Sequence, residues 1–439
     1  MRVLVVGGGA REHALAARLA AERDVDEVVA APGNPGIERV ARVVPVDAAN
    51  TDELVSLARR AQIDLTVVGP ELPLSLGIVD RFRAAGRFIV GPTRAAAALE
   101  SSKAFAKAFL ARHGVPTARF QIADTLDAAL RVIASRQFAF PLVLKADGLA
   151  AGKGVVIADD ERAAREAVVA AMRDKRFGAA GERLVIEECL TGTELSFFAV
   201  ADGMRAIALG SAEDHKRIFD DDRGPNTGGM GALAPSPLVD DALERRIMRE
   251  IVDPVMAGMA SDGHSYTGFL YAGLMLTASG PKVIEFNVRL GDPEAQVVLP
   301  LVDQPLLPLL TAAATGSLGP SRCRLGREKI VGVVMASRGY PESAGVGHAI
   351  DGIERAEAIP GVSVYHAGVA RRDGRLVTAG GRVLTVVGRG ADFSEATLRA
   401  YAGVMQISFE GMQYRRDIGR RAIAHEDNSQ LSTSKLQTD

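Results

Sequence analysis

The chain has 439 residues, of which 47% are hydrophobic and 24% charged, a balance typical of globular proteins with several buried cores. Its 54 acidic and 52 basic residues leave a net charge of −2, which argues against binding to nucleic acid or an anionic membrane through bulk charge. No apolar stretch approaches the roughly 20 residues of a membrane helix. Two cysteines, Cys189 and Cys323, are too few for a disulfide framework or a cysteine metal site. We expect a cytoplasmic, monomeric protein with no nucleic-acid or membrane partner.

Residues 1–100 alternate short β-branched runs with amphipathic stretches. The expected strands are Val3–Val6, Glu27–Ala30, Leu65–Val68 and Phe88–Val90, and the expected helices are Glu12–Arg23, Thr51–Ala61 and Ser75–Ala85. Buried parallel strands are continuous apolar runs, so this alternation predicts an α/β domain with a doubly wound parallel sheet. Ligands of such sheets bind beyond the carboxyl ends of the strands. We therefore expect one crevice lined by the turn that follows each strand: Gly7–Gly9, Pro32–Gly36, Gly69–Glu71 and Gly91–Pro92.

Beyond residue 100 the pattern changes, and two further domains are expected. The first, 101–325, contains a smaller α/β lobe over 119–190. Its main elements are a helix at Ser102–Arg112 and strands at Glu194–Val200, Gly268–Leu276 and Lys282–Arg289. The second, 326–425, is an α/β domain with strands at Ile330–Ala336 and Gly381–Val387 and a helix at Asp392–Gln406. Residues 426–439 are polar and aperiodic, which predicts a disordered tail.

The first glycine turn, Gly7 to Gly9, opens a helix that begins near Glu12 and His13. The free N–H groups and dipole of a helix amino terminus attract phosphate. However, Glu12 stands where the third glycine of a dinucleotide fingerprint belongs, and the second strand ends without an acid for a ribose hydroxyl. This argues against a nicotinamide cofactor and leaves either a phosphate-bearing substrate or a purely structural turn.

A second glycine loop lies between two apolar strands in Phe140–Val155. It is not a P-loop, because the spacing from Gly148 to Gly152 is one residue short and Gly154 stands where Ser or Thr is needed. Glycines still let backbone N–H groups approach an anion closely, and Lys145 and Lys153 flank the loop. The alternative is a hairpin with surface lysines.

The strand at Glu285–Arg289 carries the most informative pattern. Alternate side chains of a strand share a face, so Ile284, Phe286 and Val288 form an apolar face. Glu285, Asn287 and Arg289 share the other face. A carboxylate and an amide oxygen suit a hard cation, and a guanidinium beside them suits a carboxylate or phosphate. The alternative is a salt-bridged edge strand.

Acidic and glycine-rich segments surround this strand in the sequence. Asp292 and Glu294 follow it directly, and the charged turn Glu213–Arg217 and the glycine-dense loop Gly224–Gly231 precede it. Between two predicted site strands, the turn and loop are interpreted as substrate-binding, although charge runs are commonly solvated surface.

Together these motifs resemble the phosphoribosylamine–glycine ligase family of the ATP-grasp superfamily, over almost the whole chain from Val3 to Arg421. The resemblance implies an ATP-grasp fold with an N-terminal pre-ATP-grasp domain and a C-terminal α/β domain. ATP would lie between the 119–190 lobe and the body. The implied reaction joins glycine to 5-phosphoribosylamine with ATP through a glycyl phosphate, giving glycinamide ribonucleotide, ADP and phosphate in de novo purine biosynthesis.

The resemblance also implies roles for individual residues. The implied ATP ligands are Lys103, Lys145, Gly148, Gly152, Lys153, Gly154, Glu187, Leu190 and Glu194. The implied substrate ligands are Gly9, Arg11, Glu12, His13, Gly33, Asn34, Pro35, Gly69, Pro70, Glu71, Lys216, Gly228, Gly229 and Met230. Glu285 and Asn287 would bind Mg²⁺ or Mn²⁺. Arg289, Asp292 and Asp214 would serve catalysis, with Arg289 steadying the glycine carboxylate or its acyl phosphate.

The chain departs from the family pattern at four positions: Gly8, Ala10, Cys189 and Tyr414. The strand at Gly268–Leu276 lacks a second metal-binding carboxylate, so phosphate oxygens and water would have to complete the coordination of the metal. Two other functions are considered: an ATP-grasp ligase acting on a different ribonucleotide, and a nucleotide-sensing protein without catalysis. The chain has the predicted lysines, metal-binding residues and arginine together, which favours an enzyme over a sensing protein. The substrate loops favour the glycine ligase over a ligase for another ribonucleotide.

Overall fold

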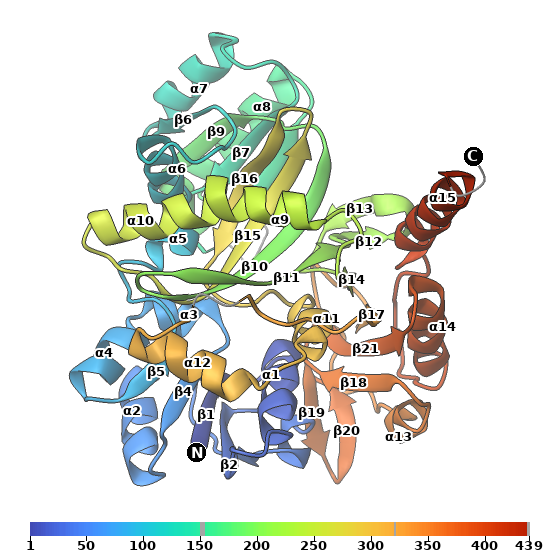
Figure 1. Cartoon of the computed structure of the whole chain (residues 1–439). Coiled ribbons are helices and arrows are strands. Elements are labelled where there is room, and N and C mark those ends of the chain that lie inside the picture. Colours follow the sequence, from blue (N-terminus) through green and yellow to red (C-terminus); the bar gives the residue numbers. More distant parts are fainter. Residues whose placement is uncertain (150–153, 320–321, 437–439) are drawn as a thin grey trace.

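The computed structural model describes residues 1–149, 154–319 and 322–436. Figure 1 shows the N-terminal domain in blue at the lower left, the lobe at the top and the C-terminal region at the lower right. Within the described residues, no helix is long and apolar enough to cross a bilayer.

The N-terminal domain is built on a parallel sheet, as the sequence predicts. The sheet has five strands in the order β3-β2-β1-β4-β5, of which β3 was not expected from the sequence. Its elements are β1 (Arg2–Gly7), α1 (Ala10–Ala20), β2 (Glu27–Pro32), η1 (Ile37–Arg39), β3 (Arg42–Val43), α2 (Thr51–Arg60), β4 (Leu65–Val68), α3 (Glu71–Ser75), α4 (Ile78–Ala84) and β5 (Phe88–Val90). The single helix expected at Ser75–Ala85 is wrong. Gly77 adopts φ +83° between α3 and α4, and a left-handed residue ends one helix before the next begins.

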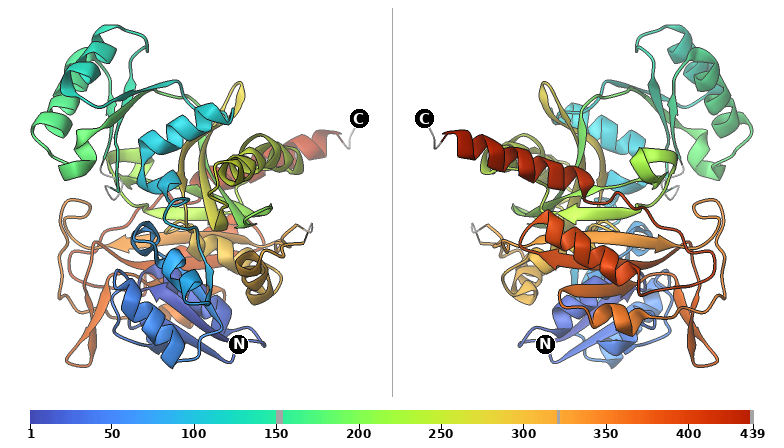
Figure 2. Two further views of the ribbon diagram at one scale, coloured as in Figure 1. Left: turned by 90° about the vertical axis from the view of Figure 1, so that its left-hand side faces the viewer. Right: turned by 90° about the vertical axis from the view of Figure 1, so that its right-hand side faces the viewer.

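The lobe is a four-stranded antiparallel sheet with the order β6-β9-β7-β8, covered by helices on one side. Its elements are β6 (Phe120–Ala123), α7 (Leu126–Ala134), β7 (Leu142–Ala146), β8 (Val155–Ala158), α8 (Glu161–Val168), η2 (Val169–Arg173), η3 (Gly178–Glu182) and β9 (Leu184–Glu188). The lobe has its own apolar core, which includes Ile133, Leu144 and Ile186. Both views of Figure 2 place it at the opposite end of the molecule from the N-terminal domain.

The body is an eight-stranded sheet with the order β16-β15-β10-β11-β14-β17-β21-β18. Its strands are β10 (Thr193–Asp202), β11 (Ala206–Asp214), β14 (Gly231–Ala234), β15 (Thr267–Thr277), β16 (Gly280–Asn287), β17 (Lys329–Ala336), β18 (Val362–His366) and β21 (Arg382–Gly390). Two small hairpins flank it: β12 (Arg217–Phe219) with β13 (Arg223–Asn226), and β19 (Val369–Arg372) with β20 (Arg375–Thr378). Since β14 pairs with β17, strands of the C-terminal region extend the same sheet that carries the predicted metal-binding strand.

Helices join and cover these sheets. They are α5 (Ala98–Ser101), α6 (Lys103–Arg112), η4 (Asp220–Asp222), α9 (Asp241–Ile247), η5 (Met248–Val252), α10 (Asp253–Ser261), α11 (Ala295–Val298), η6 (Leu299–Leu301), α12 (Leu306–Thr315), α13 (Ile353–Glu357), α14 (Phe393–Val404) and α15 (Arg420–Leu436).

The disordered tail expected from residue 426 is wrong as far as Leu436, because α15 runs through it and extends from the body (Figure 1). The start of α15 is fixed by packing that sequence periodicity does not reveal. Ala422 is buried, and the Glu426 carboxylate accepts a hydrogen bond of 2.9 Å from the backbone N–H of Phe393.

The N-terminal domain meets the C-terminal region at His13 and Asn34. The Nδ1 atom of His13 accepts a hydrogen bond of 2.9 Å from the backbone N–H of His366, and the two rings lie edge to face. The Asn34 amide donates to the carbonyls of Gly8 at 2.8 Å and His366 at 2.7 Å. Its own oxygen accepts from the N–H groups of Gly36 and Ile37. These bonds join the first two turns of the parallel sheet to the end of β18.

We predict that His13 makes the stability of this contact depend on pH. Burial, with the charges of His366 and Arg39, lowers the pKa of His13 from 6.5 to about 3. The unfolded chain therefore binds the proton more readily, and the stability contributed by neutral His13 is lost as the pH falls below 6.5. Protonation would also remove the acceptor that bonds His366.

The test compares His13→Asn, whose side-chain oxygen can replace the Nδ1 acceptor, with the wild-type chain. Between pH 7.5 and 5 the free energy of unfolding of the wild type should fall by about 2 kcal/mol more than that of the variant. Urea denaturation at each pH measures this difference, with His264→Asn at a half-exposed loop position as the control. Equal pH dependence in wild type and His13→Asn would contradict the assignment.

Candidate functional site

A β-bulge in β16 shapes the centre of the site. Glu285 pairs with Gly273 of β15, whereas the next partner, Leu274, pairs with Val283, so Ile284 has no partner in the ladder. Val283 is fully buried in the core, and Ile284 lines a pocket beside Glu285. The predicted apolar face is therefore wrong at Ile284, because strict alternation does not survive an inserted residue. It holds at Phe286, which is 2% exposed.

This pocket collects charged and polar groups from four strands and the turn after β11. Its lining residues are Glu194, Leu195, Ser196, Asp214, Lys216, Tyr271, Gly273, Leu274, Ile284 and Glu285. Burial opposes ionisation of Glu285, but the positive charges of Lys216 and Lys145, followed by Lys103, lower the pKa of its carboxyl. Glu285 is therefore a carboxylate at neutral pH. Asn287 lies two residues further along β16, opposite Tyr271.

Lys145 connects the lobe to this pocket. Its ammonium donates a hydrogen bond of 2.9 Å to the Ile284 carbonyl, the group that the bulge leaves outside the ladder. It also pairs with Glu187 on β9, and the second oxygen of Glu187 pairs with Lys107 on α6. All three side chains are nearly fully buried. Burial lowers the pKa of Lys107 to about 8, although Glu187 acts in the opposite direction.

The start of α6 contacts the glycine loop of the lobe. Lys103 donates a hydrogen bond of 2.8 Å to the Gly148 carbonyl. The Asp147 carboxylate accepts from the Ser102 hydroxyl at 2.8 Å and from the N–H of Ala104 at 3.0 Å. The predicted ligands Gly152 and Lys153 lie outside the described residues.

Two other predicted ATP ligands, Gly154 and Leu190, lie next to strands of the lobe: Gly154 directly before β8 and Leu190 shortly after β9. The Gly154 carbonyl accepts a hydrogen bond of 2.8 Å from the N–H of Ala146, which closes the base of the loop. Leu190 lies half-buried in the segment between β9 and β10.

Lys216 faces the opposite side of the pocket. Its ammonium donates a hydrogen bond of 2.7 Å to the Glu194 carboxylate on β10. Burial opposes its charge, but Tyr271, Glu194 and Glu285 together raise its pKa well above the usual value. Lys216 therefore remains protonated.

Asp214 and Glu294 form a buried acidic pair beside Lys216. Burial is the main cause that raises the pKa of both carboxyls, and repulsion from Glu294 raises the pKa of Asp214 further. One oxygen of Asp214 is buried without a hydrogen-bond partner. This arrangement suits a group that takes up a proton more readily than an ordinary carboxylate does.

The glycine-dense loop approaches this pair closely. Gly229 has φ +109°, and a Cβ atom there would lie 2.4 Å from Cδ of Pro293 and 2.8 Å from a carboxylate oxygen of Asp214. No side chain fits this position. The neighbouring Gly228 donates its N–H to the Tyr340 hydroxyl at 2.9 Å, and Met230 is fully buried behind it.

Asp292 is bound by the C-terminal region. Arg382 on β21 donates to its carboxylate at 2.9 Å, and Gln296 donates to its other oxygen at 2.6 Å. Although burial opposes ionisation, the charges of Arg382 and Arg11 lower the pKa of Asp292. Asp292 is an ionised residue at the border between β16 and the C-terminal region.

Arg289 lies just beyond β16 and reaches toward the N-terminal domain. It donates to the Glu71 carboxylate at 3.1 Å and to the Leu290 carbonyl at 3.2 Å, and it pairs with Glu100 at 2.9 Å. Burial opposes its charge, but Glu100 and Glu71 raise its pKa above the usual value. The carboxyl of Glu71, in turn, has a lowered pKa because Arg289 and Arg11 outweigh burial.

The first glycine turn is organised by Glu12. Its carboxylate accepts from the N–H of Gly9 and from Nε of Arg11, each at 2.6 Å. A Cβ atom at Gly69 would lie 2.1 Å from the Glu12 carboxylate, so only glycine allows the β4 turn to approach. The same carboxylate thus holds the turns after β1 and β4 together.

The remaining substrate candidates lie in the turns after β2 and β4. Gly33 donates its N–H to the Gly7 carbonyl at 3.1 Å, Pro35 follows in the same turn, and Pro70 precedes α3. The side chains of His13 and Asn34 are directed to β18 instead.

Sequence reasoning missed several residues of the site, among them Lys107, Glu100, Arg382 and Tyr340. Lys107 lies four residues after Lys103 on α6, a spacing that places both on adjacent turns and could have indicated a shared role. Arg382 and Tyr340 come from segments that are distant in the chain. No local sequence pattern indicates that they contact the site.

Comparison with known proteins gives a consistent result across the chain. Family models of phosphoribosylglycinamide synthetase match residues 1–100 (N domain), 101–295 (ATP-grasp domain) and 330–421 (C domain). The chain belongs to this family. Proteins named phosphoribosylamine–glycine ligase from Xylella fastidiosa and Ralstonia nicotianae are 50% and 49% identical to it. These alignments cover 97% and 96% of this chain and 99% and 100% of the relatives.

Solved structures agree with the fold. The phosphoribosylamine–glycine ligase of Thermotoga maritima matches with a TM-score of 0.83 and 35% identity, over 95% of this chain and 100% of that chain. The biotin carboxylase domain of the Hydrogenobacter thermophilus 2-oxoglutarate carboxylase, solved with MgADP, ADP and bicarbonate, matches with a TM-score of 0.73 and 17% identity, covering 94% and 91%. The predicted ATP-grasp fold and the predicted family are confirmed.

We predict that Lys145 and Lys107 differ in their effect on ATP, although both pair with Glu187. Lys145→Met should raise the Kd for ATP by about 10- to 100-fold, because a buried charge-assisted bond contributes about 1.5–3 kcal/mol. Lys107→Met removes the other partner of Glu187 and should change the Kd by less than about threefold, since Lys107 bonds Thr117 rather than the pocket strand.

Isothermal titration with ATP measures both variants, and thermal unfolding records the structural cost that they share. Equal loss of ATP affinity in the two variants would show that only the integrity of Glu187 matters and would exclude a specific role for Lys145.

Proposed function

We propose that this chain catalyses the ATP-dependent ligation of glycine to 5-phosphoribosylamine, with glycinamide ribonucleotide, ADP and phosphate as products. The observation that carries the proposal is the ionised, half-buried Glu285, with Lys145 at the adjacent Ile284 carbonyl and Lys216 in the same pocket. The family and the full-length relatives named for this activity support it.

The first step of the proposed reaction activates glycine. An oxygen of the glycine carboxylate attacks the γ-phosphorus of ATP, the bond to the β-phosphate oxygen breaks, and ADP leaves with that electron pair. Such transfers depend on positioning and on neutralising the phosphate oxygens. Lys103 and Lys145 approach from α6 and the lobe, and Lys216 approaches from the body. We propose that these lysines hold the phosphates and the acyl phosphate.

The donor set fits a divalent cation bound together with the nucleotide. Among the residues that the structure describes, no group of three or more His, Cys, Asp or Glu side chains is arranged to hold a metal. Glu285 supplies one anionic oxygen and Asn287 a neutral one, and phosphate oxygens would complete the coordination. Bound there, Mg²⁺ or Mn²⁺ would neutralise charge on the transferring phosphoryl group.

The second step forms the amide bond. The amine of phosphoribosylamine attacks the carbonyl carbon of glycyl phosphate, the carbon–oxygen bond to the phosphate breaks, and the nitrogen loses a proton. Asp214, with its raised pKa and unpartnered oxygen, is our candidate to receive that proton. Arg289 and Asp292 stand where the crevice of the N-terminal turns meets the pocket. We propose that Arg289 orients the carboxylate of glycine, while Asp292 holds Arg382 against the glycine-dense loop Gly224–Gly231.

The ribose phosphate would bind in the crevice of the N-terminal domain, at the turns after β1, β2 and β4. The N–H groups of Gly9 and Gly33 are already bonded within the protein, so the anion would be bound by N–H groups at the start of α1. The cytoplasmic location and the monomeric state stay predictions from the sequence.

The acyl phosphate route makes a prediction that isotope transfer can test. If the carboxylate of glycine carries a heavy oxygen isotope, one labelled oxygen should appear in the inorganic phosphate, because the attacking oxygen stays on phosphorus. ADP release should require glycine, phosphoribosylamine and a divalent cation, each omitted in turn. Label-free phosphate, or full phosphate release without glycine, would contradict the proposed reaction.

The metal assignment makes a separate prediction. Glu285→Gln keeps the size of the side chain but removes its charge, and should lower kcat by about 100-fold or more and weaken the apparent affinity for the cation. Titration of Mg²⁺ and Mn²⁺ in the ADP-release assay measures both effects. The control is Glu250→Gln, an exposed carboxylate on η5 that pairs with Arg246 and Arg249. Unchanged metal dependence in Glu285→Gln would remove the assignment.

A further inference from the structure

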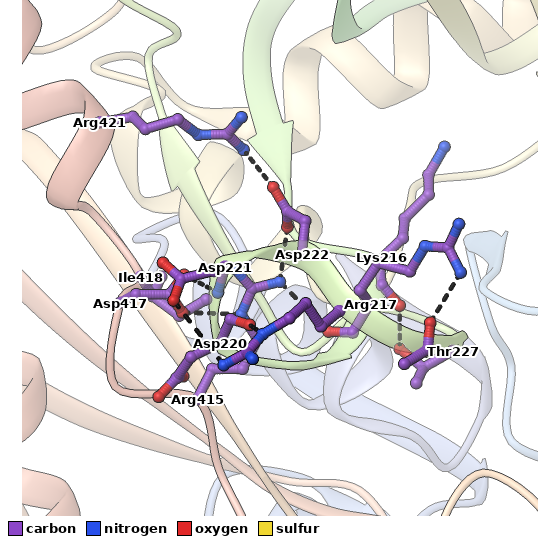
Figure 3. A network of polar contacts seen from close by, with 12 residues as sticks. Lys216, Arg217, Asp220, Asp221, Asp222, Thr227, Arg415, Asp417, Ile418 and Arg421 are labelled. Carbon is purple, nitrogen blue, oxygen red and sulfur yellow. Dashed lines mark hydrogen bonds and ion pairs between the residues drawn. The ribbon is translucent and has the colours of Figure 1, made fainter.

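A buried arginine of the C-terminal region is bound to the turn at Asp220–Asp222, which precedes the glycine-dense loop Gly224–Gly231. The side chain of Arg415 is 1% exposed, although it lies far along the chain from any predicted ligand. It donates to both oxygens of Asp417, at 2.8 and 2.6 Å, to the Asp222 carboxylate at 2.7 Å and to the Arg217 carbonyl at 3.2 Å (Figure 3). Asp417 and Asp222 both have lowered pKa values; burial opposes this, but their hydrogen bonds to Arg415 outweigh it.

The turn that Arg415 binds has an unfavourable backbone. Asp221 and Asp222 are consecutive non-glycine residues with φ +59° and +52°, a conformation that L side chains rarely adopt. The C-terminal segment bonds this turn twice more. The N–H of Asp221 donates to Asp417 at 3.0 Å, and the N–H of Arg416 donates to Asp220 at 2.7 Å. A strained turn persists only where its surroundings hold it, and here the surroundings are residues 415–417 together with Arg420 and Arg421, which pair with Asp221 and Asp222.

The same turn connects β12 to β13 in their hairpin. Lys216 lies at the other end of this hairpin, directly before β12. The Lys216 carbonyl accepts from both the N–H and the hydroxyl of Thr227, at 2.8 and 2.7 Å. The next carbonyl along the chain, that of Arg217, is the one that Arg415 binds. On the other side of Lys216, His215 exchanges backbone hydrogen bonds with Met230 and Gly231. Arg415 is therefore one residue away from the backbone of the lysine that enters the pocket.

We propose that Arg415 is a positioning residue for the ligation reaction, acting through the β12–β13 hairpin to hold Lys216 in the pocket. The inference rests on the proposed role of Lys216. It gives the C-terminal region a part in catalysis. A forked guanidinium is required, because one group must bind two carboxylates and a carbonyl in fixed directions.

The test compares Arg415→Lys, which keeps the charge but not the fork, with Arg420→Gln. Arg420 is 66% exposed and pairs with Asp221 in the same cluster, so its variant controls for the general loss of an ion pair. Arg415→Lys should lower kcat by about 10- to 100-fold and leave the Kd for ATP within about twofold, because Lys103 and Lys145 lie on other elements. Arg420→Gln should change neither value.

Two further measurements separate positioning from a structural defect. Hydrogen exchange in Arg415→Lys should increase over residues 215–231 and remain as in the wild type over β17 and β21. In a Lys216→Met background, Arg415→Lys should lower the residual rate of ADP release by less than about twofold, since a residue that acts through Lys216 has nothing left to position.

Each outcome bears on one proposal. Full activity of Lys216→Met would overturn the site assignment itself. Two results would overturn only the role of Arg415, provided that Lys216→Met lowers kcat. In the first, Arg415→Lys leaves kcat unchanged. In the second, Arg415→Lys lowers the rate of ADP release by the same factor in the wild-type and Lys216→Met backgrounds. If Arg415→Lys does not fold, Asp222→Asn takes its place, because Asp222 is 43% exposed and its loss leaves the pair of Arg415 with Asp417 intact.

Discussion

The site depends on a balance of buried charge at one strand. Glu285 lies half-buried in a pocket, and burial by itself acts to raise the pKa of its carboxyl. It remains a carboxylate because lysines from three different parts of the chain surround it: α6, the lobe and the turn after β11. Two of these lysines pair with acids of their own, Lys145 with Glu187 and Lys216 with Glu194. These charged groups come from separate parts of the chain, so the lobe, the eight-stranded sheet and the turn after β11 must come together for the centre to exist.

A ligand of high negative charge would replace these internal pairs rather than add to them. Lys145 is bound to Glu187 and to a backbone carbonyl, and Lys103 is bound to the Gly148 carbonyl. A triphosphate that reaches these ammonium groups exchanges one set of charge-assisted bonds for another, which limits the desolvation cost of binding. The acidic pair of Asp214 and Glu294 lies on the other side of Lys216. The pocket thus has positive charge on the side of the lobe. On the side of the glycine-dense loop Gly224–Gly231 it has carboxyl groups that can hold a proton.

The sequence predicts the elements that repeat a local pattern and misses those set by distant contacts. The apolar runs of the N-terminal sheet and the family of the chain follow from the printed residues, and the structure and comparisons confirm both. The bulge at Ile284 could not be predicted, because it depends on how β16 aligns with β15 and not on residue type. The direction of His13 and Asn34 toward β18 was also hidden, since their partner His366 lies hundreds of positions away in the chain. Residues 426–436 are helical where composition indicated disorder, because docking of Ala422 and Glu426 fixes the start of α15.

The continuity of the eight-stranded sheet explains why the C-terminal region belongs to the site. The pairing of β14 with β17 joins the glycine loop to the C-terminal strands by backbone hydrogen bonds. From that base, Arg382 reaches Asp292 and Gly228, Tyr340 reaches Gly228, and Arg415 reaches the hairpin beyond Lys216. The region therefore contacts both the β12–β13 hairpin, at the Arg217 carbonyl, and the glycine-dense loop Gly224–Gly231, at Gly228. A loop rich in glycine has high conformational entropy when free, so its functional geometry must come from such external bonds and not from its own sequence.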